Sequence, residues 1–177
     1  MEWIISPAVA ADIPALVTLV NSAYRGETSR QGWTTEADLL EGTRTDAEHL
    51  LEEMQAPGVT LLKLEDEKGQ LSACVYLQVQ NNHELYLGML TVAPHLQNKG
   101  LGKLLLQEAE QRARSNGLSA IVMTVITDRA ELIAWYRRHG YEPTGTTKPF
   151  VEGVHIGAPR KPLQFLELKK PLTGRQR

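Results

Sequence analysis

The stretch LYLGMLTVAPHLQNKGLG, residues 85–102, decides the fold of this chain. Its first half, Leu85–Val92, is mostly apolar and predicts a strand that ends before Pro94. Its second half contains the loop Gln97–Gly102 and leads into Gly102–Asn116, whose apolar residues recur at helical spacing. A strand, a glycine loop and a helix are therefore predicted to follow one another directly.

The segments upstream of this stretch predict an antiparallel meander. Trp3–Ile5, Val59–Leu64 and Leu71–Val79 have the composition of strands, and short turns join the later ones. Consecutive strands joined by short turns pair antiparallel. A helix is expected over Ala10–Tyr24, and two short helices are expected within Thr35–Met54.

The segments downstream predict a parallel strand pair. Ala120–Ile126 reads as an apolar strand and Ala130–His139 as a second helix, and Gln164–Lys169 alternates like a last strand after a long loop. A strand, a helical crossover and a strand form a parallel pair. We expect an α/β chain with one mixed, mostly antiparallel twisted sheet, a locally parallel central pair and flanking helices, as a single domain over residues 1–177.

Composition narrows the class of protein. Of 177 residues, 42% are hydrophobic and 23% are charged, and the net charge of -2 gives no broad electrostatic reason to bind nucleic acid. One cysteine, Cys74, excludes a disulfide within the chain and fits an inert, buried thiol better than a nucleophile. Met1–Val9 lacks the features of a signal peptide, and no stretch could span a membrane. These features predict a cytoplasmic protein without a membrane partner. The five histidines are not spaced like the ligands of a metal site.

The loop Gln97–Gly102 has features that are typical of an anion-binding site. Gly100 and Gly102 lack side chains, so backbone N–H groups can turn inward, and the following helix adds unsatisfied donors and a positive dipole end. Lys99 and Lys103 add positive charge. Two glycines alone are often only a turn. The loop also lacks the third glycine of a dinucleotide fingerprint and the Gly-Lys-Ser/Thr of a P-loop.

A longer pattern is more specific. Gln97-x-x-Gly100-x-Gly102, after its strand, resembles the central motif of the GNAT superfamily of acyl-CoA-dependent N-acetyltransferases. The next predicted strand and the segment LIAWYRRHGY, Leu132–Tyr141, resemble the elements that follow in that family. The likeness covers roughly residues 85–145 and implies the GNAT fold.

The resemblance implies acetyl-CoA as cosubstrate and no metal. In the family, the central strand pairs with the pantetheine arm and the loop takes the pyrophosphate. Many members also carry an asparagine before the late helix, where this chain has Thr127-Asp128-Arg129, so Thr127 or a side chain beside it is expected to replace that asparagine. The other positions that match cofactor contacts are Leu90, Thr91, Val92, Gln97, Asn98, Lys99, Gly100, Leu101, Gly102 and Lys103.

Two residues are candidates for proton transfer. By resemblance, Tyr136 protonates the departing thiolate; with an ordinary pKa near ~10 it can donate at neutral pH. The other interpretation of Tyr136 is a core aromatic. Glu84, on the same strand face as Tyr86, is the candidate base, and the alternative is a solvated charge at a strand start.

The acceptor amine has fewer signals. By resemblance, the first helices shape its pocket, where Glu36 could pair with an ammonium and Arg44 with a carboxylate. The alternative is an ordinary helix entry capped by Thr34 or Thr35. The candidate acceptor residues are Tyr24, Trp33, Glu36, Arg44 and Tyr86.

The function expected from all of this is transfer of an acetyl group from acetyl-CoA to a primary amine of a small molecule or peptide. A non-catalytic acyl-CoA-binding or sensing module of the same fold is the alternative. A protein-interaction module does not explain the joint spacing of Gln97, Gly100, Gly102 and Tyr136. The acceptor's identity, the acyl length and a homodimeric state stay open.

Overall fold

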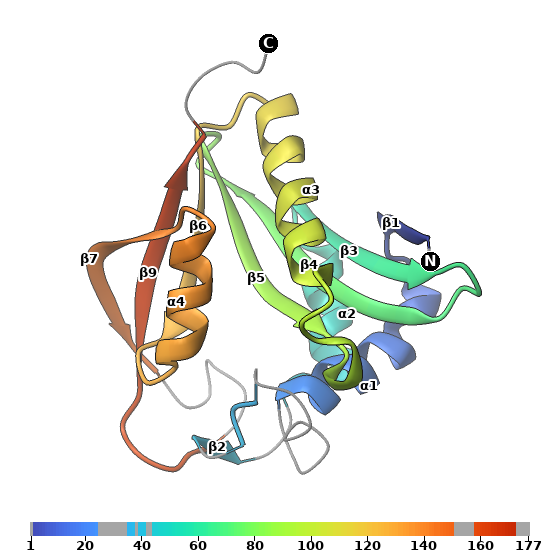
Figure 1. The fold of residues 1–177 in the computed structure, drawn as a ribbon, viewed down its shortest axis with the longest axis horizontal. Coiled ribbons are helices and arrows are strands. Elements are labelled where there is room, and N and C mark those ends of the chain that lie inside the picture. The colour runs from blue at the N-terminus through green and yellow to red at the C-terminus, as the bar shows by residue number, and fades with distance from the viewer. Residues whose placement is uncertain (1, 25–34, 38, 42–43, 151–157, 173–177) are drawn as a thin grey trace.

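The computed structural model describes residues 2–24, 35–37, 39–41, 44–150 and 158–172. Within these residues a seven-stranded sheet has the order β1-β3-β4-β5-β6-β9-β7 (Figure 1). Its strands are β1 (Trp3–Pro7), β3 (Val59–Asp66), β4 (Leu71–Gln80), β5 (Glu84–Val92), β6 (Ala120–Ile126), β7 (Glu142–Pro149) and β9 (Gln164–Pro171). The α-helices are α1 (Ile13–Tyr24), α2 (Ala47–Gln55), α3 (Leu101–Ser115) and α4 (Ala130–Arg138).

The mixed sheet with a parallel central pair is confirmed. β5 and β6 run parallel, while the other neighbours in the sheet pair antiparallel. The parallel pairing covers only Glu84–Tyr86 against Ala120–Val122. Beyond it, β5 stays with β4 and β6 stays with β9, so the two strands diverge (Figure 1). The sheet is therefore split along part of its length.

A β-bulge in β5 accompanies the split. The register with β4 moves from Cys74↔Thr91 to Tyr76↔Gly88, which leaves one β5 residue more than β4 residues between the two pairs. Met89 lies in this interval with a positive φ of 51°. A bulge bends its strand and increases its twist, and this bend accompanies the departure of β5 from β6.

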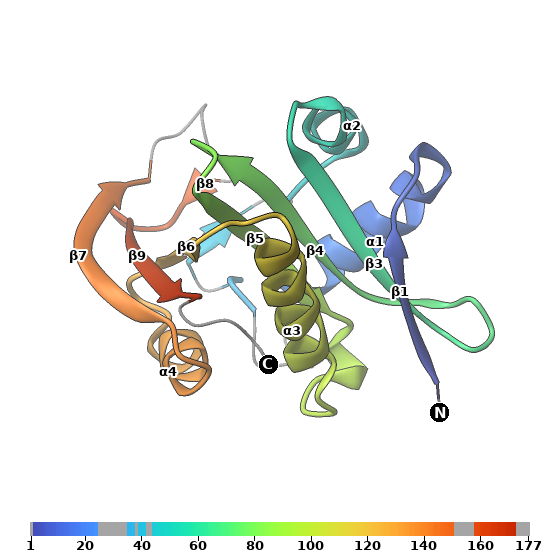
Figure 2. The same ribbon diagram turned by 90° about the horizontal axis from the view of Figure 1, so that it is seen from above.

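Helices α1 and α2 lie on one face of the sheet and α3 lies on the other (Figure 2), and an apolar cluster fills the space on each face. Leu62 and Val75 pack with Leu105 of α3, whereas Leu61 and Cys74 pack on the other face with α1 and α2. The alternation follows the period of two in a strand. Burial raises the pKa of the Cys74 thiol to about 12, which keeps it protonated at neutral pH and agrees with the inert interpretation.

Two expectations about local structure were wrong. Within Thr35–Met54 the described residues contain α2 but no second helix; Leu40–Glu41 instead forms β2, paired with β8 (Ala158–Pro159). The segment expected to be a loop before the last strand contains β7. β7 is an exposed edge strand with two prolines, so it carries no apolar alternation that could reveal it.

The remaining helices and strands lie within a few residues of their predicted positions. Asp46 begins α2 by accepting a hydrogen bond from the His49 backbone N–H (2.7 Å), and Gly100 precedes α3. No helix among the described residues has both the length and the apolar character needed to cross a membrane.

Candidate active site

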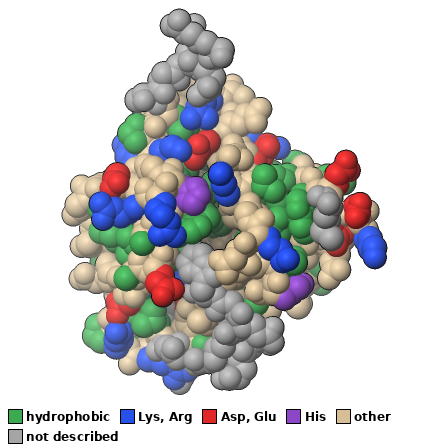
Figure 3. Space-filling model, viewed as in Figure 1, with side chains coloured by type: hydrophobic (Ala, Val, Ile, Leu, Met, Phe, Trp, Pro, Cys, Tyr) green, Lys and Arg blue, Asp and Glu red, His purple; other side chains and the backbone are tan. Residues whose placement is uncertain are grey.

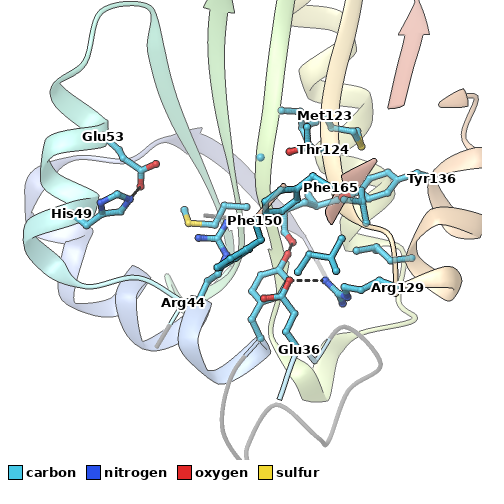
Figure 4. Close-up of a pocket in the computed structure, with 18 residues that line it drawn as sticks. Glu36, Arg44, His49, Glu53, Met123, Thr124, Arg129, Tyr136, Phe150 and Phe165 are labelled. Carbon is cyan, nitrogen blue, oxygen red and sulfur yellow. Dashed lines mark hydrogen bonds and ion pairs between the residues drawn. The ribbon is translucent and has the colours of Figure 1, made fainter. Parts of the chain in front are cut away.

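Two pockets open where β5 and β6 diverge. We call the first the split pocket; it has a volume of about 310 Å³ and lies between the two strands and α2 (Figure 4). It is lined by Tyr24, Glu36, Arg44, His49, Glu53, Leu87, Gly88, Met89, Leu90, Met123, Thr124, Val125, Ile126, Arg129, Leu132, Tyr136, Phe150 and Phe165.

The second, the loop pocket, has a volume of about 290 Å³ and lies between the glycine loop and α4. Lys and Arg side chains gather around the hollow in this part of the surface (Figure 3). The loop pocket is lined by Leu90, Val92, Leu96, Gln97, Asn98, Gly100, Leu101, Gly102, Lys103, Leu132, Trp135, Tyr136 and His139. The two pockets share Leu90, Leu132 and Tyr136, so they meet at these side chains.

The glycine loop turns sharply into α3. Gly100 has a φ of +83°, a conformation that residues with a Cβ rarely adopt. A Cβ on Gly102 would lie 3.2 Å from the Trp135 ring, so the helix start and α4 approach closely here. Gln97 Nε2 donates to the Val92 carbonyl (3.0 Å) and ties the loop back to β5. The first N–H groups of α3, which have no partner within the helix, therefore lie at the loop pocket.

Tyr136 lies at the junction of the pockets. Its side chain extends from α4, is 5% exposed and packs edge-on against Trp135 and Tyr141. Burial raises the pKa of the Tyr136 hydroxyl, and the nearby Tyr24 raises it further, so the hydroxyl is a proton donor at neutral pH.

Tyr24 connects α1 to the bulged strand. Its hydroxyl donates a hydrogen bond to the Leu90 carbonyl. The guanidinium groups of Arg44 and Arg129 lie 5.8 Å and 5.6 Å from the centre of its ring. Burial raises the pKa of Tyr24; Arg129 lowers it and Glu36 raises it. The hydroxyl therefore stays protonated and holds the Leu90 peptide in place.

A buried ion pair lies beside Tyr24. Arg129 Nη1 is 3.2 Å from Glu36 Oε2, and both side chains are nearly inaccessible to solvent. Glu36 was among the predicted residues, but Arg129 was not. Its position in the short turn between a strand and a helix was the available signal.

The α2 side of the split pocket was also missed. His49 Nε2 lies 3.4 Å from Glu53 Oε1, one helical turn further along α2. Burial raises the pKa of the Glu53 carboxyl, and His49 and Arg44 lower it. The i, i+4 spacing indicated a pair, but it could not show which face of α2 meets a pocket.

Several predicted residues lie outside both pockets. Glu84 is at the end of β5 where β5 and β6 still pair, and its carboxylate is 2.6 Å from Lys169 Nζ. This location does not favour Glu84 as a base, since the site lies at the other, diverging end. Tyr86 reaches the split pocket only indirectly, through its hydroxyl 3.4 Å from Thr124 Oγ1.

Three predicted cofactor residues do not line the loop pocket. The Thr91 hydroxyl donates to the Met89 carbonyl within β5 (2.9 Å), Lys99 is exposed, and the Thr127 hydroxyl lies 3.4 Å from Asp128 Oδ1. Trp33 lies outside the described residues. The other predicted cofactor positions line the loop pocket, and Tyr24, Glu36 and Arg44 line the split pocket. Among the described residues, no group of three or more His, Cys, Asp or Glu side chains could hold a metal ion.

Comparison with known sequences gives a family match. Residues 19–141 match the model of the acetyltransferase (GNAT) family. An amino-acid acetyltransferase from Pseudomonas fluorescens is 32% identical over 84 residues, which are 47% of this chain and 18% of that protein. The chain thus spans less than half the length of the curated relatives it matches.

Comparison with solved structures gives the same fold. The ribosomal-protein-S18-alanine N-acetyltransferase of Escherichia coli matches with a TM-score of 0.72 and 17% identity, over 99% of this chain and 97% of that one. A phosphinothricin acetyltransferase from Sinorhizobium meliloti, solved in complex with acetyl-CoA, matches with a TM-score of 0.68 and 20% identity, over 97% and 89%. At these identities the likeness concerns the fold.

Proposed function

Because the chain belongs to the GNAT acetyltransferase family, we propose that it transfers the acetyl group of acetyl-CoA directly to a primary amine. One observation carries this proposal. A pocket built on backbone N–H donors and a pocket lined by charged side chains meet at Leu90 and Tyr136. Two reactants could enter from opposite sides and react at that junction.

The loop pocket suits the acyl-CoA. The start of α3 offers backbone donors and the positive end of a helix dipole to the pyrophosphate, and Lys103 adds charge. Leu90 and Val92 offer the β5 backbone to the pantetheine arm, because the split leaves this end of β5 without a partner on the β6 side. Acetyl-CoA would supply the thioester, and no other cofactor chemistry is needed.

In the proposed reaction the amine nitrogen forms a bond to the acetyl carbon, and the carbon–sulfur bond breaks. The Tyr136 hydroxyl donates its proton to the departing sulfur, and burial, which raises the pKa of this hydroxyl, keeps the phenol protonated until that step. A backbone N–H near Leu90 would stabilise the developing oxyanion. Tyr24 contributes by fixing the Leu90 peptide through its carbonyl.

The proton of the incoming amine needs an acceptor. An amine of pKa near ~10.4 is largely protonated at pH 7. Glu53 is the carboxylate of the split pocket that is not paired with an arginine, and it has His49 beside it. We therefore assign the base to Glu53, directly or through water, in place of Glu84.

Tyr136→Phe tests the proposal with a nearly isosteric change. We expect acetyl-CoA affinity to change little, because the α3 donors are untouched. We expect the single-turnover rate of acetyl transfer to fall by ~10²–10⁴-fold. A wild-type rate would show that Tyr136 is only a packing aromatic. Binding of acetyl-CoA by the wild type, without transfer to any amine of a broad panel, would support a sensing module instead.

A further inference from the structure

Some of the charged side chains that line the split pocket form an ion pair with each other, and others do not. Four charged side chains other than histidine line it, and two of them, Glu36 and Arg129, neutralise each other at 3.2 Å while buried. That leaves Arg44 and Glu53 as a positive and a negative group facing the same cavity. A ligand that complements this pocket needs both signs of charge.

Arg44 is held in place but keeps its donors available. Its backbone N–H donates to Asn21 Oδ1 (2.6 Å), and its guanidinium lies over the Tyr24 ring. Among the described residues, no carboxylate lies within ion-pair distance of the guanidinium. Figure 4 shows Arg44 between the His49–Glu53 pair and Phe150. A half-buried guanidinium that faces a pocket without a carboxylate partner among the described residues suits a ligand carboxylate, which it can bind through two parallel hydrogen bonds.

Glu53 supplies the opposite charge on the same side of the cavity. It lies near enough to Arg44 for the guanidinium to affect its titration, but the two are not in contact. An ammonium beside Glu53 and a carboxylate on Arg44 would each meet an opposite charge. Figure 4 shows Arg44 and Glu53 at the same end of the split pocket, so a small molecule that carries both groups could contact them together.

The pocket is small, and most of its other lining side chains are apolar. Phe150 and Phe165 stack with ring centres 5.7 Å apart, and Met89 and Met123 lie on the strand sides. The volume of about 310 Å³ is at the lower end for small-molecule sites. These walls suit one apolar side chain rather than a long or highly charged one.

We infer that the acceptor is a free amino acid, or a close analogue, with an apolar side chain: its carboxylate binds Arg44, and its amine lies next to Glu53. The inference rests on the proposed acetyl transfer and names its substrate class. Arg44 is then a specificity-determining residue, since it binds a part of the acceptor that does not react.

A matched acceptor series tests this. Thiol release from acetyl-CoA is measured with leucine, methionine and phenylalanine, with the amide of each, and with the corresponding amines that lack the carboxylate. We expect kcat/KM for the best amino acid to exceed that of its amide and its amine at least ~10-fold, the usual worth of a charge-assisted contact. Arg44→Met should remove this preference, so that the kcat/KM of the amino acid falls to about that of its amide. Arg112→Gln, a surface arginine of α3 paired with Glu108, is the control and should retain the preference.

The outcomes separate this inference from the proposed function. Amides or simple amines acetylated as well as the amino acids would overturn the inference and leave acetyl transfer standing. An unchanged preference in Arg44→Met would remove Arg44 as the anchor. No turnover with any of the nine acceptors, together with a thermal shift by acetyl-CoA, would also overturn the substrate class. No turnover and no thermal shift by acetyl-CoA would overturn the proposed function itself.

Discussion

Two buried clusters in this protein have the same ingredients: a carboxylate, a cation and a tyrosine. The core cluster consists of Glu110, Lys170 and Tyr141, and the pocket cluster of Glu36, Arg129 and Tyr24. In each, the cation lies 5.6 Å from the centre of the tyrosine ring. Because the two clusters are so alike, their differences indicate what distinguishes a structural cluster from a functional one.

The difference lies in where the tyrosine hydroxyl points. In the core cluster Tyr141 donates to Glu110 Oε2 (2.9 Å) and Lys170 donates to Oε1 (3.0 Å), so both carboxylate oxygens are bonded within the cluster. In the pocket cluster Tyr24 instead donates to the backbone of Leu90, and the ion pair lines a cavity. A buried carboxylate is common to both. Only the pocket cluster lines a cavity and is hydrogen-bonded to the backbone of Leu90 in the candidate site.

The largest effect is expected from Arg129→Met, which leaves the buried Glu36 carboxylate without its arginine. Removing one partner of a buried ion pair costs about 3–5 kcal/mol. The urea midpoint should therefore fall sharply. The double variant Glu36→Gln/Arg129→Met should recover much of that stability without recovering acetyl transfer. Recovery of both would mean that the pocket cluster is structural, like its counterpart.

Glu110→Gln is the matched change in the core cluster. Lys170 is partly exposed and can reach water, so the loss of stability should be smaller, about 1–3 kcal/mol. The kcat/KM of the folded variant should stay within about two-fold of wild type, because the core cluster lines neither pocket. A loss of activity larger than ten-fold at a temperature where the variant is folded would contradict the distinction.

Tyr24→Phe removes the hydrogen bond to Leu90 and keeps the ring beneath the two guanidiniums. The expected cost in stability is about 1 kcal/mol, because the Leu90 carbonyl loses a buried donor. We expect kcat to fall more than KM changes, since the Leu90 peptide is held less firmly. Tyr141→Phe is the control, and it should lower stability with little change in kcat. Equal kcat values for both variants would remove the positioning role of Tyr24.

The smallest effect concerns Glu53, an acid outside both clusters. Burial raises its pKa in the folded protein, so its contribution to stability is fully present below the unfolded pKa of about 4.3 and is lost as pH rises through the folded pKa. Glu53→Gln should therefore be slightly more stable than wild type at pH 8, and the advantage should vanish near pH 4. Urea midpoints at the two pH values measure this. A less stable variant at pH 8 would show that the charged form is favoured instead.

The sequence was informative where the site is local. The spacing of Gln97, Gly100 and Gly102 encodes a tight turn and a helix start within a few residues, so the loop pocket could be predicted. Tyr136 was predicted only through the resemblance of Leu132–Tyr141 to a segment of the GNAT family. Arg129 and Glu53 could not be found in this way, because they converge only after β5 and β6 diverge.

In the fold, too, locally encoded features were predicted and features that depend on distant segments were not. Strands with a buried face were predicted because their apolar residues are regular, whereas the exposed edge strand β7 left no such pattern. The expected base, Glu84, was chosen from its strand face alone. Its position along the strand, at the closed end of the split, depends on the length of the β5–β6 pairing, which neighbouring residues do not encode.

The bulge at Met89 shifts the phase of the whole strand. Before it, Leu85 and Leu87 belong to the α3 face; after it, Leu90 belongs to that face, while Met89 packs with α1. The single additional residue reverses the face of the sheet to which the following side chains of β5 point. A variant with one residue inserted or deleted at Met89 would have almost the same composition and the same glycine motif. The residues of β5 after the bulge would then face the opposite side of the sheet. Counting residues between the strand start and the loop is therefore as informative as reading their identities.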